Sequence, residues 1–231
     1  MAFQGYTQQT VDFMWGIRFN NERGWFLEHK DDYINTFLTP TRELGEQVYD
    51  AVHALLPDEP LMLKVSRIYR DARRLFGRGP YKDHLWWCIR TGDKDWTGRP
   101  TFWFELGPDY YSFGLGFWSP AAALMETYRK QIDAYPEELS KLVRQFNRQS
   151  VFTLDGPEYA RSKGQTSDLL RSWYQKKSLS LRWEGPLDER IFTSALAEDI
   201  IAGFKTLIPF YHYFNKLVAL TPRQERRGEE A

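Results

Sequence analysis

Four short segments between residues 61 and 117 constrain the fold of this chain more than any other feature. They cover residues 61–69, 85–90, 101–106 and 109–117, and each is rich in β-branched or aromatic side chains. Clusters of Gly, Pro and Asp separate them, as is typical of strands joined by turns. The pattern predicts a largely antiparallel meander.

The side chains of the third and fourth segments alternate in size and polarity. Phe102 and Phe104 alternate with Trp103 and Glu105, and the fourth segment places glycine at every second position near its end. Successive side chains of a strand point to opposite faces of the sheet. One face is therefore expected to carry bulky apolar groups and the other to be smaller and more polar.

Apolar residues at helical spacing flank the meander on both sides in the sequence. Thr10 is the expected N-cap of the first helix, and Ser119 followed by Pro120 predicts the start of another. Residues 179–183 are expected to return as a strand, and Asp188 to open a long helical region interrupted at Pro209. The fold class is α+β, with a central, mostly antiparallel sheet of about five strands flanked by helices.

Length and composition favour one stable domain. The chain has 231 residues, of which 9 are Trp, 13 Tyr and 16 Phe, and no Gly/Ser- or Pro-rich linker divides it. Residues 1–221 are expected to form one α+β domain and residues 222–231 a flexible tail. With Cys88 as its single cysteine, no signal-peptide pattern and no apolar run long enough for a membrane span, the chain is expected to be cytoplasmic.

The formal net charge of zero conceals local imbalance. Residues 1–60 hold 4 basic and 10 acidic side chains, whereas residues 61–99 hold 10 and 4, and residues 161–182 hold 6 and 1. Overall neutrality argues against a protein that coats nucleic acid, which would carry a basic surplus. The basic groups are instead concentrated in two windows.

The first basic window predicts a cleft for an anion. Guanidinium groups bind phosphate or carboxylate through paired N–H donors, and aromatic rings beside them can stack a planar group. The candidate ligand-binding residues are Arg67, Arg70, Asp71, Arg73, Tyr81 and Lys82, with Asp71 orienting the guanidinium groups. The alternative is a structural belt of ion pairs, in which Asp71 only neutralises its neighbours and Tyr81 is packed.

Five segments together carry a resemblance to a known family. They are NNERGWF at 20–26, RDAR at 70–73, PYK at 80–82, GLG at 114–116 and LLR at 169–171. In this order they resemble the domain-of-unknown-function family 2461 over nearly the whole chain. The matching positions are Asn20, Asn21, Trp25, Phe26, Arg70, Asp71, Arg73, Pro80, Tyr81 and Lys82.

The chain departs from the family pattern inside the second motif. Arg74 and Leu75 stand where the family usually has Phe-Ser, and Gly77 and Arg78 where it has Asp-Lys. These replacements argue against an intact catalytic apparatus. The resemblance therefore implies the fold and the choice of site, and no reaction.

Three classes of function stay open. The leading one is binding of an anionic small molecule or polymer end in a basic, aromatic-lined cleft. The second is a hydrolase or transferase in which Asp71, His84 or Tyr81 transfers protons. The third, less favoured, is a nucleic-acid or protein-interaction module; a monomer and a homodimer are both compatible with the sequence.

Other candidate groups have simpler structural explanations. Asn20 and Asn21 are expected to end one helix and begin the next, and Gly114 and Gly116 to admit a closely packed backbone. Cys88 is expected to be a buried, inert thiol. The four histidines lack paired metal-ligand spacing and no cofactor motif is present, so neither a metal nor a cofactor is expected.

Overall fold

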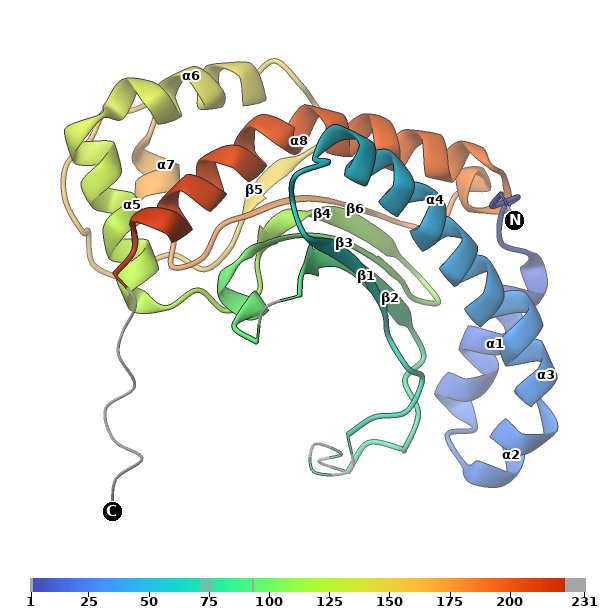
Figure 1. Ribbon diagram of the computed structural model, residues 1–231. Coiled ribbons are helices and arrows are strands. Elements are labelled where there is room, and N and C mark those ends of the chain that lie inside the picture. Colours follow the sequence, from blue (N-terminus) through green and yellow to red (C-terminus); the bar gives the residue numbers. More distant parts are fainter. Residues whose placement is uncertain (1, 72, 74, 76, 93, 223–231) are drawn as a thin grey trace.

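The computed structural model describes the chain except for residues 1, 72, 74, 76, 93 and 223–231. A curved sheet lies at its centre, and helices cover the convex face and both ends of the sheet (Figure 1). The expected flexible tail lies outside the described residues apart from Pro222.

The sheet of the described chain has six strands in the order β1-β2-β3-β4-β6-β5, and every neighbouring pair is antiparallel. Its strands are β1 (Leu61–Val65), β2 (Leu85–Thr91), β3 (Pro100–Leu106), β4 (Tyr111–Phe117), β5 (Thr153–Asp155) and β6 (Ser180–Gly185). The predicted α+β class and antiparallel meander are confirmed. The strand beyond the expected five is β5, whose three residues are too short to show a period of two.

The N-terminal helices are α1 (Gln8–Phe19), α2 (Arg23–Glu28), α3 (Lys30–Asp32) and α4 (Thr39–Leu55), with a π-helical segment at Tyr33–Leu38. The prediction that α1 begins after Thr10 was wrong. The Thr7 N–H donates to the Thr10 hydroxyl at 3.1 Å, which makes Thr7 the cap and Thr10 the third residue of the helix.

The C-terminal half contains α5 (Ala122–Ala134), α6 (Pro136–Phe146), α7 (Arg171–Tyr174), a 3₁₀ turn at Glu189–Phe192 and α8 (Ala195–Leu220). The prediction that Ser119 caps α5 was wrong. The N-cap is Ala121, whose backbone is extended, and the Ser119 N–H donates to the Thr97 carbonyl at 2.8 Å instead. Within the described chain, no helix has the length and apolar content that a membrane crossing requires.

Pro209 lies inside α8 and does not interrupt it, contrary to the prediction. Leu207, Phe210 and Tyr211 on either side of it are at most 2% exposed. Burial of these side chains outweighs the one backbone hydrogen bond that proline removes. The helix therefore continues across the sheet.

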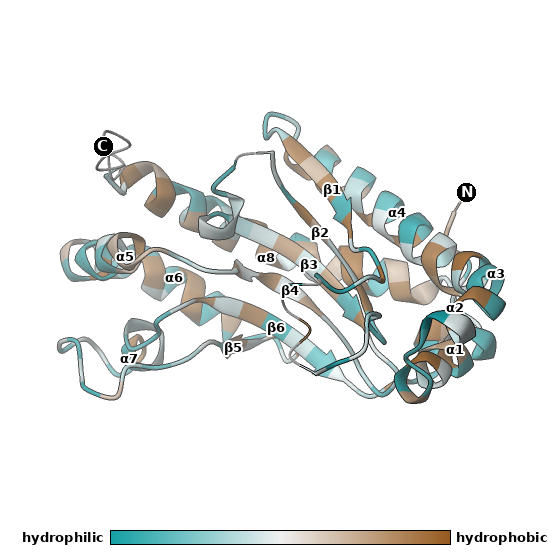
Figure 2. Cartoon of the chain, turned by 90° about the horizontal axis from the view of Figure 1, so that it is seen from below, coloured by the Kyte–Doolittle hydropathy of each residue, from teal (hydrophilic) through white to brown (hydrophobic). Residues whose placement is uncertain are grey.

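The core lies between the convex face of the sheet and the two long helices α4 and α8 (Figure 1). The ring of Phe102 on β3 lies 4.8 Å from Phe204 and 5.4 Å from Tyr211 on α8, and Trp87 stacks on Phe104 at 5.4 Å. The bulky face predicted from the alternation is this buried one. Seen from below, the strands lie in front of α8, so the opposite, concave face is turned to the viewer (Figure 2).

Candidate functional site

The strand register brings chemically distinct side chains together on the concave face of the sheet. Trp86 on β2 lies opposite Glu105 on β3, which lies opposite Ser112 on β4. In the next row Cys88 faces Trp103. The polar face predicted from the alternation therefore also carries large indole rings.

Two glycines on β4 keep this face hollow. A Cβ at Gly114 would lie 2.2 Å from the Leu181 carbonyl oxygen, and one at Gly116 would lie 2.5 Å from that of Leu179. The predicted close approach of another backbone is confirmed, and the backbone is that of β6 and the residue before it. Because these positions have no side chain, Trp103 stands beside a depression in the sheet.

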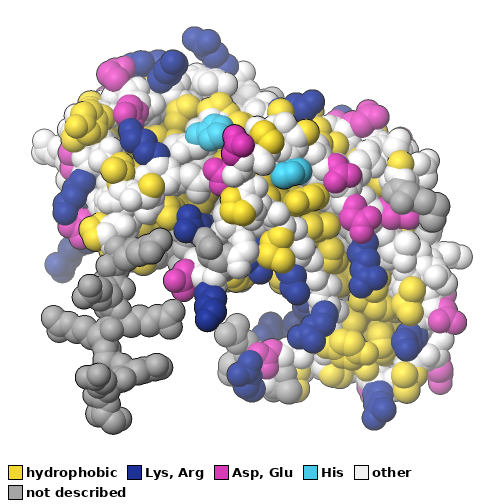
Figure 3. Space-filling model, in the orientation of Figure 1, with side chains coloured by type: hydrophobic (Ala, Val, Ile, Leu, Met, Phe, Trp, Pro, Cys, Tyr) yellow, Lys and Arg dark blue, Asp and Glu magenta, His cyan; other side chains and the backbone are white. Residues whose placement is uncertain are grey.

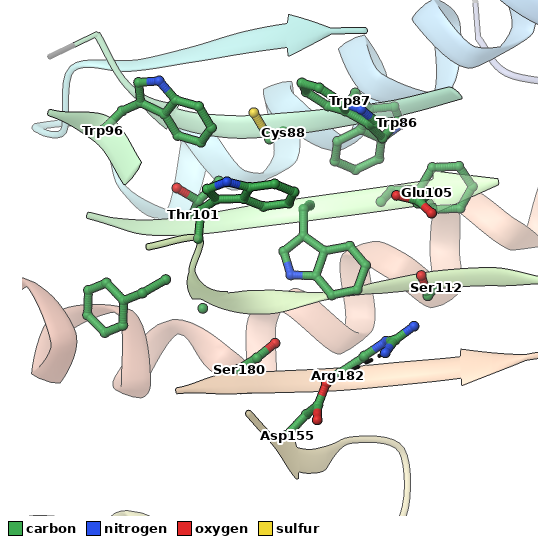
Figure 4. Close-up of a pocket in the computed structure, with 15 residues that line it drawn as sticks. Trp86, Trp87, Cys88, Trp96, Thr101, Glu105, Ser112, Asp155, Ser180 and Arg182 are labelled. Carbon is green, nitrogen blue, oxygen red and sulfur yellow. Dashed lines mark ion pairs between the residues drawn. The ribbon is translucent and has the colours of Figure 1, made fainter. Parts of the chain in front are cut away.

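A pocket of about 490 Å³ occupies the concave face. Five tryptophans from β2, β3 and the adjoining loops, the buried Trp87 among them, line it together with polar groups of β3, β4, β5 and β6 (Figure 4). The side chains that matter for binding are Trp86, Trp96, Trp103, Trp118, Glu105, Ser112, Asp155, Ser180 and Arg182. Pockets that bind small molecules combine large apolar walls with a few polar groups in this way.

The carboxylates of the pocket already have partners. Arg182 pairs with Asp155 at 3.6 Å and with Glu184, and its side chain extends from β6 toward Ser112 (Figure 4). Glu105 accepts a hydrogen bond from Tyr110, and burial together with that bond raises the pKa of the Tyr110 phenol. Each of these carboxylates thus pairs with a donor within the protein, Asp155 and Glu184 with the same guanidinium and Glu105 with a phenol.

Residues 66–84, between β1 and β2, belong to the first basic window. They form an arm that extends the β1–β2 hairpin beyond the sheet (Figure 1). The Lys82 N–H donates to the Ile68 carbonyl at 2.7 Å, and the Arg70 N–H to the Pro80 carbonyl at 2.8 Å. The predicted strand 61–69 is therefore regular only to Val65 and then continues as this arm.

Three of the predicted ligand-binding residues lie close together at the base of the arm. Lys82 lies over the ring of Trp86, 5.6 Å from its centroid. Burial, and next the charge of Arg70, lower the pKa of Lys82 to about 8; Arg67 adds to this and Glu105 opposes it. Positive charge therefore accumulates at one end of the Trp-lined pocket.

Asp71 and Arg73 lie at the exposed tip of the arm. Arg73 donates to Asp71 from Nε at 3.0 Å and from Nη2 at 2.8 Å, and its side chain is 87% exposed. This exposed pair is the neutralising arrangement considered above for Asp71. Arg74 and Phe76 lie outside the described residues.

Tyr81 is packed in the core at 4% exposure, where its ring stacks on Phe26 at 4.4 Å. The Asn21 side chain donates to the Tyr81 carbonyl at 3.0 Å and accepts from its N–H at 2.9 Å. The same carbonyl accepts from Arg70 Nε at 2.8 Å. The segments that carry the family resemblance thus meet around one backbone position. Asn20 ends α1 as predicted, but the expectation that this pair also begins the next helix was wrong, because the N-cap of α2 is Glu22.

A second polar cluster adjoins the arm. Asp83 accepts from Arg18 Nε at 2.6 Å and lies 2.9 Å from His84 Nδ1, while Arg70 Nη2 is 3.9 Å away. The bond to His84, followed by that to Arg18, holds the pKa of Asp83 well below its usual range. The carboxylate is ionised at neutral pH and fixes the orientation of the His84 ring.

Sequence reasoning missed the tryptophan wall. The signal was present, because Trp86 and Trp103 occupy polar-face positions of their strands. Arg182 and Glu105 become neighbours of the site only through the strand register.

The thiol of Cys88 is buried, as predicted. Cys88 is 4% exposed, and burial raises the pKa of its thiol to about 11. Among the described residues, no group of three or more His, Cys, Asp or Glu side chains is placed to hold a metal ion.

Figure 3 shows the hollow beneath the sheet, with Lys and Arg side chains along it.

The comparisons with known proteins agree with the resemblance carried by the Asn21, Tyr81 and Lys82 segments. No curated protein matches the chain. A family model described as a conserved hypothetical protein (DUF2461) matches residues 9–213, which include the whole sheet, the arm and most of α8. The chain therefore belongs to the DUF2461 family.

Proposed function

We propose that this protein binds an anionic ligand with a flat ring on the concave face of its sheet. The ring lies against the indoles of the pocket, and the anionic group lies toward the base of the arm, at Lys82, Arg70 and Arg67. The observation that carries this proposal is the position of two cations over pocket tryptophans: Lys82 at 5.6 Å from Trp86 and Arg90 at 4.7 Å from Trp96.

The charge balance supports an anion rather than a cation. Glu105, Asp155 and Glu184 have donors within the protein, whereas no carboxylate in the described chain forms an ion pair with Lys82 or Arg90. The lowered pKa of Lys82 reflects partial burial and nearby positive charge. An anion bound there relieves that repulsion and raises the pKa again.

The other predicted site residues do not contact the ligand in this proposal but hold the arm in place or form its tip. Tyr81 anchors the arm to α2 by stacking on Phe26, and Asp71 with Arg73 forms the tip. In this proposal Lys82, Arg70 and Arg67 contact the ligand directly. Cytoplasmic localisation belongs to the proposal as well and is supported by the single cysteine.

Isothermal titration with adenosine 5′-monophosphate, adenosine and inorganic phosphate tests the proposal. We expect the monophosphate to bind at least tenfold more tightly than either part alone, because it uses both the rings and the cations. Trp103→Ala and Lys82→Gln should each weaken it about tenfold or more, the loss of one stacking or charged contact. Lys205→Gln, which removes an exposed cation from α8, is the matched control. Equal binding of adenosine and the monophosphate, or no binding of any probe, would refute the proposal.

A second candidate is a hydrolase or transferase at the same place, and the contact between His84 and Asp83 favours it. A carboxylate 2.9 Å from one ring nitrogen of a histidine leaves the other nitrogen to move a proton. Incubation with the monophosphate followed by a phosphate-release assay tests this candidate. Product formation that disappears in His84→Gln would support it, and an inert mixture would exclude phosphate-ester hydrolysis.

A further inference from the structure

The second basic window contains an unusual cluster of three cations around one ring. Lys163 Nζ lies 4.4 Å from the centroid of the Tyr159 ring, Arg129 Cζ lies 5.1 Å from it and Lys177 Nζ lies 5.5 Å from it. The three residues come from α5, from the loop after β5 and from the segment before β6. They are brought together only by the fold.

Carboxylates near this cluster have other partners. Glu158 pairs with Lys176 at 3.0 Å, Asp133 accepts from Tyr174 at 3.1 Å, and Glu126 pairs with Lys130 at 2.8 Å. In the described chain no ion pair joins Arg129, Lys163 or Lys177 to a carboxylate, and Arg129 Nη1 is buried without a hydrogen-bond partner. We call these three residues and Tyr159 the Tyr159 cluster.

Such a cluster favours an anion as its occupant. One ring attracts each cation only weakly, and three like charges around it repel one another. A buried guanidinium donor without an acceptor adds the cost of an unmade hydrogen bond. A phosphate group would satisfy both the charges and the donor.

The Tyr159 cluster lies just beyond the end of the β5–β6 pairing that borders the pocket. Asp155 and Ser180 line the pocket and pair across β5 and β6. The pairing continues outward, since the Lys177 N–H donates to the Pro157 carbonyl at 2.7 Å and the Tyr159 N–H to the Gln175 carbonyl at 3.0 Å. The cluster therefore lies at the end of the pocket opposite Lys82.

The separation of the two cationic groups sets the size of the ligand. From β2 to β5 the sheet crosses four strand spacings, and the cluster lies several residues further along the strands than Trp86. At about 4.8 Å per strand and 3.3 Å per residue, the two ends are roughly 25–30 Å apart. A mononucleotide cannot reach both, whereas a chain of several nucleotides can.

We propose that the Tyr159 cluster is a second phosphate-binding site and that the concave face binds a single-stranded oligonucleotide across its whole width. Phosphates contact the base of the arm at one end and the Tyr159 cluster at the other, and bases stack on the tryptophans between them. This inference depends on the proposed function for the pocket and adds the class of ligand. The strand runs diagonally, from β2 toward the extension of β5 and β6.

Fluorescence anisotropy with labelled oligothymidylates of two, four, eight and twelve nucleotides tests the inference, at 50 and 200 mM salt. We expect affinity to rise at least tenfold between two and eight nucleotides and then level off. In the triple variant Arg129→Gln/Lys163→Gln/Lys177→Gln the eight-nucleotide probe should bind at least tenfold more weakly. The salt dependence should weaken as well: the slope of log K against log salt should become shallower by about 0.7, the contribution of one phosphate contact on a single strand.

Two controls separate charge from site. Lys141→Gln/Arg148→Gln/Lys205→Gln removes three exposed cations from α6, the turn after it and α8, and should leave the affinity within twofold of wild type. Thermal melting of both triple variants checks that they fold. Polyglutamate should fail to compete at concentrations where unlabelled oligothymidylate displaces the probe, because only bases can stack.

The outcomes distinguish this inference from the proposed function. If the monophosphate binds but affinity does not increase with length, or if the Tyr159-cluster variant binds the eight-nucleotide probe as wild type does, the second site is refuted and the pocket remains. Equal competition by polyglutamate overturns the assignment to nucleic acid. If no probe of any length binds, both proposals fail.

Discussion

Replacing Asn21 by alanine should destabilise the protein far more than its half-buried position suggests. The Asn21 side chain donates to the Tyr81 carbonyl at 3.0 Å and accepts from the Tyr81 N–H at 2.9 Å, so it pairs with both polar groups of one backbone position. Gly79 packs directly against it, because a Cβ there would lie 2.2 Å from Asn21 Oδ1. Water therefore has little room to replace the amide.

The expected loss follows from the Tyr81 N–H, which is left without a partner. Arg70 still donates to the Tyr81 carbonyl in the variant, and leaving one buried donor unsatisfied costs about 1–3 kcal/mol. We therefore expect Asn21→Ala to lower the free energy of unfolding by about 1–3 kcal/mol. At a slope of about 2 kcal/mol per M, the urea midpoint falls by about 0.5–1.5 M.

Urea unfolding followed by tryptophan fluorescence measures this loss, and hydrogen exchange of the Tyr81 amide shows whether the arm opens first. Asn147→Ala, at the exposed end of α6, is the matched control and should change stability by less than 0.5 kcal/mol, as surface substitutions usually do. A midpoint for Asn21→Ala equal to that of the control, with Tyr81 exchange unchanged, would refute the assigned role.

Three further predictions concern single positions. Lys82→Met should abolish a gain in stability that wild type shows with rising pH. The pKa of Lys82 is about 8 in the folded protein and 10.5 ordinarily, so the wild-type protein becomes more stable as pH rises between these values. Urea unfolding of both proteins at pH 7.5 and 10 measures the difference. Asp83→Asn should cost about 1–3 kcal/mol at pH 7. Because the folded pKa of Asp83 lies below its ordinary 3.8, the difference from wild type should narrow as pH falls below about 4, and a constant gap would contradict the ion-pair assignment. Pro209→Ala should raise Tm, because alanine restores a backbone donor inside a continuous helix, where proline costs up to about 3 kcal/mol. A lower Tm would show instead that the proline ring packs better than alanine.

The lowered pKa of Lys82 also links stability to binding. An anion at the base of the arm stabilises the charged amine, so the pKa of Lys82 should rise when the monophosphate binds. NMR titration of the lysine side chains with and without the probe measures that shift. An unchanged pKa in a saturated complex would place the anionic group elsewhere.

The amino-acid sequence determined the meander, because the alternation of Phe102, Trp103, Phe104 and Glu105 is a local property of one strand. It also determined the bulky and polar faces and the buried state of Cys88. The sequence did not determine the residue at which each helix begins. Thr10 and Ser119 have the residue types that cap helices, but tertiary hydrogen bonds and neighbouring residues decide which of several candidates is used.

Packing against the sheet decided that α8 continues through Pro209. The helix propensity of the local sequence carries no information about that packing. The tertiary structure also divided the residues of the first basic window. It places Lys82 with its two neighbouring arginines at the pocket, the Asp71–Arg73 pair at the tip of the arm, and Tyr81 in the core.

The pocket itself was decided by the tertiary structure. Trp86, Trp103 and Arg182 are far apart in the sequence and become neighbours through strand register. The zero net charge likewise gave no indication that Glu105 would be partnered while Lys82 has no carboxylate ion pair in the described chain. Pairing depends on distances across strands, and these are fixed by the sheet, not by the order of residues along the chain.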